Sequence, residues 1–189
     1  MITSVARDDL ADGGASYFAA CIRELRRYAP AAIVEVLTPD FNGDTSSLDA
    51  VLEAQPDIYN HNIETVERLT PRVRSRARYH RSLEVLKYAK QKRRDASMKT
   101  KSGLMLGLNE TKEEIACTLQ DLRAAGCDYL TVGQYLQPSV RHLTVQSFVP
   151  VEDFNYWKEE AFRLGFERVA SGPLVRSSYF ADQLHSPSA

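Results

Sequence analysis

The feature that most constrains the fold is an alternation of short apolar runs with amphipathic runs along the chain. The short runs are rich in β-branched and apolar residues, which is typical of buried strands, and the longer runs have helical spacing. Strands and helices that alternate in one chain favour an α/β fold with a parallel sheet. The predicted strands span residues 33–37, 57–61, 103–108, 129–133 and 168–171, with residues 1–5 as a further candidate.

The helices between these strands have recognisable ends. Thr111 and Glu114 have the spacing of a capping box, and Gly126 follows as a stop signal. Elsewhere prolines mark where the helical spacing ends. The predicted helices span residues 12–28, 46–54, 111–125 and 150–164.

Two architectures share this pattern, an open doubly wound sheet and part of an α/β barrel. No glycine-rich dinucleotide fingerprint follows the first strand, which disfavours the doubly wound sheet. Polar residues follow each predicted strand, at the end where α/β barrels collect their active-site residues. The sequence therefore predicts a partial (β/α) barrel of parallel strands with outer helices, over residues 1–184, followed by a loose tail over residues 185–189.

Composition excludes several classes of protein. Hydrophobic residues make up 43% and charged residues 26% of the chain, which is usual for a soluble globular domain. No apolar run approaches the roughly 18 residues of a membrane-spanning helix, and the first ten residues lack an apolar signal core. Cys21, Cys117 and Cys127 lack disulfide or metal-site spacing, so we interpret them as buried thiols of a cytoplasmic protein.

The net charge of −1 conceals a strongly basic stretch over residues 68–101. This stretch holds thirteen Lys and Arg against two acids, a local balance of +11. Such a stretch faces solvent, an acidic protein partner or nucleic acid. Base-stacking aromatic residues are not interleaved through it, which disfavours nucleic acid.

Two strand regions carry candidate binding residues. Gly103 and Gly107 lie in an apolar run, where glycine allows close approach of the backbone to a flat ligand or marks a tight bend. Asn60 and Asn62 share one face of a strand if the strand continues, and His61 points to the other face. We interpret His61 as a core residue with satisfied hydrogen bonds.

Carboxylates cluster before the first helix, and hydroxyls follow the last strand. Asp12 is predicted to cap the helix, whereas Asp8 and Asp9 exceed what one cap needs and suit a ligand's ammonium group. Arg176 suits an anion, and the hydroxyls of residues 177–178 suit an oxygen ligand. A serine nucleophile is disfavoured because no base or nucleophile elbow lies nearby.

Six strings occur in one order: TSVARDDLADGG, VLTPDF, YNHNIE, TKSGLMLGLNET, LTVGQYLQPS and GPLVRSSYFA. Together they resemble the lipoyl synthases, a family of radical S-adenosylmethionine enzymes. The resemblance implies a partial barrel that binds S-adenosylmethionine at a [4Fe-4S] cluster and removes hydrogen from C6 and C8 of an octanoyl chain on a carrier domain. It also implies a second [4Fe-4S] cluster that donates sulfur, so that the cofactors carry the chemistry.

The resemblance also implies roles for individual residues. Ser177 of the RSSY string matches an oxygen ligand of the second cluster, with Ser178 as the second choice. The expected S-adenosylmethionine-binding residues are Asp8, Asp9, Asn60, Asn62, Gly103, Gly107, Glu110, Gln134, Gln137 and Arg176. No residue is assigned as catalytic.

One departure from the family is large. The family carries a CxxxCxxC motif and a further cysteine trio, neither of which is in this sequence, which resembles the C-terminal two-thirds of the enzyme. The clusters are therefore expected to be absent from this chain alone. Three hypotheses remain: a lipoyl synthase whose N-terminal portion lies elsewhere, a non-catalytic remnant with weak adenosyl affinity, and some other α/β-barrel enzyme.

The resemblance gives the basic stretch a more specific role. Octanoylated lipoyl carrier domains are commonly acidic, so the stretch over residues 68–101 is expected to dock one electrostatically. Neither nucleic acid nor a membrane is expected as a partner. The expected docking residues are Arg72, Arg74, Arg76 and Arg78.

Overall fold

The computed structural model describes residues 1–74, 76–92 and 98–178. Within them six parallel strands form one sheet in the order β1-β2-β3-β4-β5-β6, so each strand pairs with its neighbours along the chain. A sequential parallel sheet with helical crossovers is part of an α/β barrel, which confirms the predicted fold class. The strands are β1 (Ile2–Thr3), β2 (Glu35–Leu37), β3 (Ile58–Asn60), β4 (Lys99–Leu106), β5 (Tyr129–Gln134) and β6 (Arg168–Gly172).

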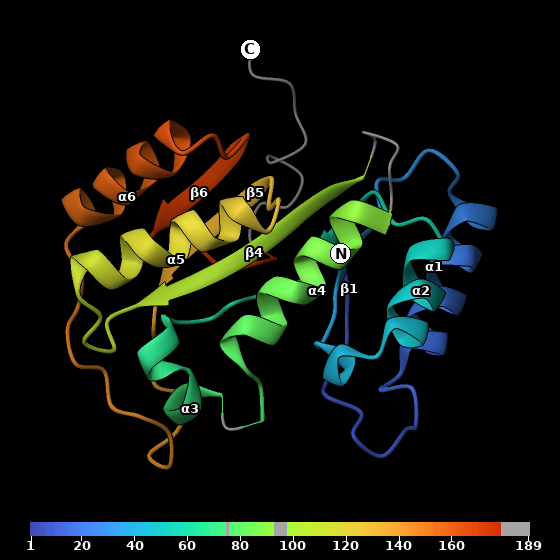
Figure 1. Cartoon of the computed structure of the whole chain (residues 1–189), viewed down its shortest axis with the longest axis horizontal. Coiled ribbons are helices and arrows are strands. Elements are labelled where there is room, and N and C mark those ends of the chain that lie inside the picture. The colour runs from blue at the N-terminus through green and yellow to red at the C-terminus, as the bar shows by residue number, and fades with distance from the viewer. Residues whose placement is uncertain (75, 93–97, 179–189) are drawn as a thin grey trace.

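The helices cover one face of this sheet. In Figure 1, α4 and α5 lie in front of the strands, with α1 and α2 on one side and α6 on the other. Two short 3₁₀ turns, η1 (Phe41–Gly43) and η2 (Glu67–Leu69), lie in the loops. The helices are α1 (Ala15–Tyr28), α2 (Thr45–Glu53), α3 (Thr70–Val73), α4 (Tyr79–Lys92), α5 (Lys112–Ala124) and α6 (Val151–Arg163).

Side chains that alternate along each strand divide the sheet into two unlike faces. Leu104 and Leu106 of β4 pack with α5 and α6 in one apolar cluster, and Val36 and Tyr59 pack with α1 and α2 in another. The opposite face, called the inner face below, carries polar side chains from β2, β3 and β4. The helix face therefore holds the core, and the inner face is available for a site.

The predicted caps are confirmed. Asp12 accepts hydrogen bonds from the backbone nitrogens of Gly14 and Ser16, at 2.9 and 2.8 Å. Thr111 and Glu114 form both bonds of the capping box at the start of α5. These side chains satisfy helix amides that have no partner within the helix.

Helix α3 was not predicted, and two further elements differ from the predictions. Helix α4 lies within the basic stretch and was not predicted, because charged residues on its exposed face conceal its apolar spacing. Strand β4 begins at Lys99 rather than at residue 103, since its polar first half pairs with both neighbouring strands. The predicted tail over residues 185–189 lies outside the described residues.

The interpretation of all three cysteines as buried thiols is wrong for two of them. Only Cys127 is buried, whereas Cys21 on α1 and Cys117 on α5 are exposed. Both exposed thiols lie on helix faces turned away from the core, next to apolar residues that do pack. No helix among the described residues is long and apolar enough to cross a membrane.

Alkylation of the folded protein should distinguish the three thiols. Burial raises the pKa of Cys127 to about 12, so iodoacetamide should not modify it until the protein unfolds. Asp121 raises the pKa of Cys117, so this thiol should react more slowly than an exposed thiol without an acidic neighbour. Peptide mass spectrometry with and without urea measures both effects, and modification of Cys127 as fast as Cys21 in native protein would contradict them.

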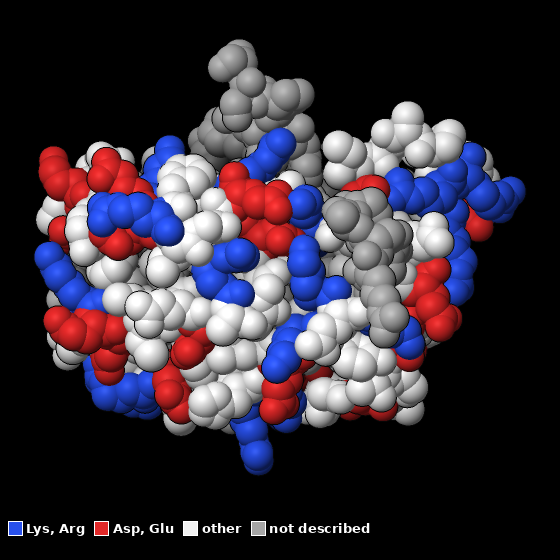
Figure 2. All heavy atoms as spheres, turned by 45° about the horizontal axis from the view of Figure 1, so that its top comes forward, with Lys and Arg blue, Asp and Glu red and all other residues white. Residues whose placement is uncertain are grey.

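The basic stretch does not form one positive surface. Acids from other elements pair with most of its cations, and Figure 2 shows Lys and Arg interspersed with Asp and Glu. These long-range pairs are invisible in a local charge count. The pairs are Arg68–Glu114, Arg76–Asp8, Arg81–Asp40, Lys90–Asp128, Lys92–Asp49, Lys99–Glu167 and Lys101–Glu35.

Candidate functional site

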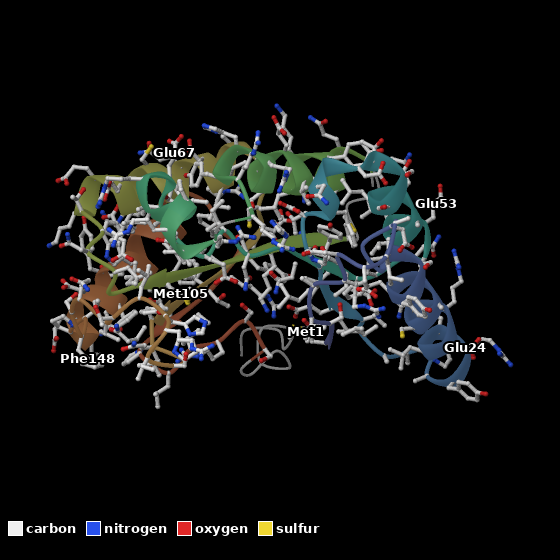
Figure 3. The ribbon with its side chains drawn as sticks, turned by 90° about the horizontal axis from the view of Figure 1, so that it is seen from below. Met1, Glu24, Glu53, Glu67, Met105 and Phe148 are labelled. Atoms are coloured by element: carbon white, nitrogen blue, oxygen red, sulfur yellow. The ribbon has the colours of Figure 1, made fainter. Side chains whose placement is uncertain are left out.

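A cavity of about 210 Å³ opens on the inner face beyond the middle of β4. It brings together four predicted site residues from distant parts of the sequence, namely Asn62, Gly103, Arg176 and Ser177. Figure 3 views the molecule from the side of α3 and the loop over residues 135–149, with Met105 of this cavity labelled. The remaining lining residues are Glu64, Leu104, Met105, Thr131, Gly133 and Val175.

The segment over residues 173–178 closes this cavity by returning across the inner face. Asn62 Nδ2 donates to Ser177 Oγ at 2.8 Å, and Ser177 Oγ donates to Asn62 Oδ1 at 3.1 Å. Lys101 Nζ donates to the backbone oxygen of Ser177 at 2.9 Å. Asn62, which directly follows the predicted strand over residues 57–61, therefore binds Ser177 of the RSSY string. Ser178 is exposed beside them.

Two glycines form the floor of the cavity. A Cβ atom at Gly103 would lie 2.8 Å from Asn62 Oδ1 and 2.9 Å from Thr131 Oγ1. A Cβ atom at Gly133 would collide with the backbone oxygen of Val175. Glycine at these positions lets the backbone approach its neighbours closely. The flat ligand predicted to lie against Gly103 stays a prediction. Thr131, which pairs with Gly103 across β4 and β5, was not predicted.

Glu64 is a further cavity residue that the sequence analysis missed. Its Oε1 accepts from Asn62 Nδ2 at 3.0 Å, and a bridge to Leu104 holds its backbone against β4. Burial raises the pKa of Glu64, which the hydrogen bond from Asn62 and the charge of Arg74 partly oppose. Its position two residues after Asn62, the spacing of one strand face, was the available signal.

A buried ion pair lies on the inner face beside the cavity. Lys101 is 0% exposed, and its Nζ donates to Glu35 Oε1 at 2.8 Å. Asn60 Nδ2 donates to the same oxygen at 3.0 Å. Among the described residues, Glu35 Oε2 and Asn60 Oδ1 have no partner. Asn60 shares the face of Asn62, as predicted, but its amide binds Glu35 and does not line the cavity.

His61 points to the opposite face, as predicted. Its Nδ1 lies 2.9 Å from the backbone oxygen of Thr38, and its Nε2 lies 2.9 Å from Ser82 Oγ. Burial and, to a lesser extent, the charge of Arg74 together lower the pKa of His61 to about 4. It is a core histidine whose two ring nitrogens are both satisfied.

Glu110 and Gly107 lie in the turn after β4. Glu110 Oε2 accepts hydrogen bonds from the backbone nitrogens of Gly107 and Leu108, each at 3.0 Å. These bonds fix the turn on which the neighbouring loop rests. Neither residue lines the cavity of about 210 Å³.

Gln134 and Gln137 hold the loop over residues 135–149. Gln134 Nε2 donates to the backbone oxygen of Ser147 at 3.0 Å, and its Oε1 accepts from the nitrogen of Val149 at 2.9 Å. Gln137 Nε2 donates to the backbone oxygen of His142 at 3.1 Å. Both amides therefore bind the loop and not the small cavity.

Asp8 and Asp9 lie apart from the other predicted site residues. Asp8 forms an ion pair with Arg76, and Asp9 binds Arg7 at 2.6 Å. Asp8 lines a separate cavity of about 590 Å³, formed by residues 6–8, 10–13, 39–42, 74, 76 and 77. The structure does not bring either carboxylate to Asn62.

The residues present do not fit an iron–sulfur cluster but include polar groups of the kind that an adenosyl group would need. The sequence holds three cysteines, in α1, in α5 and before β5, and clusters are held by several convergent thiolates. No group of three or more His, Cys, Asp or Glu side chains able to hold a metal occurs among the described residues. By contrast, Asn62, Glu64 and Thr131 offer an amide, a carboxylate and a hydroxyl to this cavity.

Comparison with known proteins identifies relatives over nearly the whole chain. The lipoyl synthases of Symbiobacterium thermophilum and Thermus thermophilus are each 55% identical to it, over 183 and 185 residues. Each match covers 97% of this chain and 57% of the relative. The mitochondrial lipoyl synthase of Branchiostoma floridae is 50% identical over 98% of this chain and 49% of its own length. These matches confirm the resemblance read from the six strings.

The chain thus spans somewhat more than half the length of the bacterial relatives. A solved radical S-adenosylmethionine methyltransferase, TsrM from Kitasatospora setae, aligns with a TM-score of 0.44 at 13% identity, over 62% of this chain and 24% of that chain. That score is too low to carry an argument. The model of the Radical SAM superfamily matches residues 1–122, well over half of the sequence. The chain belongs to the radical SAM superfamily.

Proposed function

We propose that this chain is the part of a lipoyl synthase that binds the adenosyl cofactor and the octanoyl substrate. The enzyme would insert two sulfurs at C6 and C8 of a protein-bound octanoyl group. The observation that carries the proposal is the cavity in which Asn62, Gly103, Arg176 and Ser177 meet. Three of the strings that resemble the family supply these residues, and they lie far apart in sequence.

The chain's own residues would bind and orient the cofactor. Gly103 would meet the base only once Asn62 and Thr131 moved aside, because their oxygens lie 2.8 and 2.9 Å from the place of a Cβ atom at this position. Asn62, Glu64 and Thr131 would exchange their present bonds for bonds to ribose hydroxyls or an ammonium group. S-adenosylmethionine, when bound beside a reduced cluster, supplies the one-electron chemistry that removes hydrogen from unactivated carbon.

The cysteine thiolates that hold the clusters would come from protein outside this sequence. Cys127 is buried, and Cys21 and Cys117 lie on outer helix faces, so these three thiols do not converge. Ser177 is proposed as the oxygen ligand of the second cluster because its Oγ lies in the cavity. Ser178 is the second choice, since it is exposed beside the site.

The misfit of the cysteines favours a second candidate, a non-catalytic remnant that retains adenosyl affinity. The two candidates differ in whether a CxxxCxxC motif is supplied by protein outside this sequence. Anaerobic reconstitution with iron and sulfide, followed by metal analysis, should give no cluster on this chain alone under either candidate. Iron equal to two [4Fe-4S] clusters per chain would overturn the assignment of thiolates to other protein.

The proposed partners are octanoylated carrier domains, docked through the basic stretch over residues 68–101. Arg72 and Arg78 support this docking because they are exposed and form no ion pair among the described residues. The proposed location is the cytoplasm, where free thiols such as Cys21 and Cys117 stay reduced.

Binding of S-adenosylhomocysteine, a redox-inert analogue, tests the cofactor site. The variant Gly103→Ala should weaken binding at least about tenfold by calorimetry, because the new methyl group displaces Asn62 and occupies the floor. Gly172→Ala is the matched control, since its Cβ atom would meet only Val175 Cγ2 at an ordinary 3.6 Å. Absence of binding to the unmodified chain, or equal binding by Gly103→Ala, would count against the proposed function.

A further inference from the structure

A second cavity, of about 560 Å³, adjoins the first one. The two share the lining residues Glu64 and Met105, and the pair of adjoining cavities between the loop over residues 135–149 and Ser177 is called the passage below. The other residues lining the second cavity are Arg72, Val73, Arg74, Tyr135, Arg141, His142 and Leu143.

The outer part of this passage is cationic. Arg72 and Arg141 are exposed, and the described residues give neither side chain a hydrogen bond or ion pair. They differ in this from most cations of the basic stretch, which have acidic partners. Glu64 is the single acid lining the cavity, and it lies at the inner end, bound to Asn62.

Apolar side chains line the second cavity beside Glu64 and Arg74. Val73, Met105 and Leu143 line it, together with Tyr135, whose hydroxyl donates to the backbone oxygen of Leu143 at 2.8 Å. Val140, which is 95% exposed, lies next to Arg141 in the same loop. Exposed arginines beside apolar lining residues suit a ligand that carries both acidic groups and an aliphatic chain.

The loop that carries Arg141 is held in place before any partner binds. The backbone oxygen of Gly107 accepts from the nitrogen of Gln146 at 2.8 Å. The amides of Gln134 and Gln137 bind the same loop, as described above. Arg141 therefore projects from an anchored segment, which lowers the entropic cost of binding.

We propose that Arg72 and Arg141 form a docking site for an acidic segment of the acyl-carrying protein, with the acyl arm passing Met105 toward Ser177. This inference rests on the proposed function and names the contact that its partner makes. It also leaves Arg74 and Arg76 out of the expected docking surface, because both have partners within the protein. Arg76 is paired with Asp8, and Arg74 donates inward to Ser82 Oγ at 3.0 Å.

Two fluorescent peptides test this docking site by anisotropy. Both carry an ε-octanoyl-lysine, flanked by Asp and Glu in one peptide and by Ser and Gln in the other. The acidic peptide should bind about tenfold more tightly, the value for two exposed ion pairs. The double variant Arg72→Glu/Arg141→Glu should abolish this preference, because it lowers the affinity for the acidic peptide more than the affinity for the neutral one.

The double variant Arg23→Glu/Lys158→Glu is the matched control. It makes the same charge change at exposed positions of α1 and α6, so it should keep the preference for the acidic peptide. Equal binding of both peptides to the unmodified chain would overturn the docking site alone. Failure of both peptides to bind would overturn the proposed function. Binding of anionic vesicles in place of the acidic peptide, lost in Arg72→Glu/Arg141→Glu, would assign the arginines to a membrane and also overturn the docking site.

Discussion

Replacement of Lys101 by methionine should lower the free energy of unfolding by about 3–5 kcal/mol. The ammonium of Lys101 is the cation paired with Glu35, and both side chains are buried. Methionine fills the space of the aliphatic stem but leaves the carboxylate of Glu35 with one hydrogen bond, from Asn60. Urea denaturation at neutral pH measures the loss.

A double variant and a surface control separate charge from packing. Glu35→Leu/Lys101→Met removes both charges together, and its stability should recover most of the loss, because the cost comes from an unpaired buried charge. Lys87→Met on the exposed side of α4 should change the free energy of unfolding by less than about 0.5 kcal/mol. If Lys101→Met proved as stable as Lys87→Met, the buried ion pair would not exist in solution.

Acidification should destabilise the protein through His61. Burial lowers the pKa of this imidazole from 6.5 to about 4, so below pH 6.5 the unfolded chain binds a proton that the folded chain does not. Stability is therefore lost as the pH falls from 6.5 and levels off below about 4. Between pH 7 and pH 4.5 the loss amounts to about 2 kcal/mol.

The variant His61→Asn isolates this contribution. Asparagine keeps hydrogen-bonding capacity toward Thr38 and Ser82 but does not titrate, so its stability should fall less over the same pH interval. Urea midpoints at pH 7 and pH 4.5 give the comparison. If both proteins lost the same free energy of unfolding between pH 7 and pH 4.5, His61 would not be neutral in the folded state.

Local patterns predicted the elements whose periodicity is visible within one segment. The capping box at Thr111 and Glu114, and the opposed faces of Asn60 and His61, follow from spacing alone. The order of the strands follows from their alternation with helices, because sequential crossovers place neighbouring strands side by side.

Local patterns could not predict contacts between residues that lie far apart in sequence. Lys101 reads as an exposed charge at the start of a strand, yet Glu35 and Ser177 enclose it from 66 and 76 residues away. Arg141 stands in a loop with no local signal, and its neighbour across the cavity, Arg72, lies in a stretch dominated by charge. Charge counts along the chain do not reveal which cations other elements neutralise.

The sequential strand order has a consequence for how the protein assembles during synthesis. Because each strand pairs with the one before it, the sheet can grow one strand at a time as the chain leaves the ribosome. Ser177 breaks this order, since it binds Asn62 on a strand region made 115 residues earlier. The ligand cavity is thus completed only when the segment after β6 has been translated, and partly synthesised chains would hold the sheet without the site.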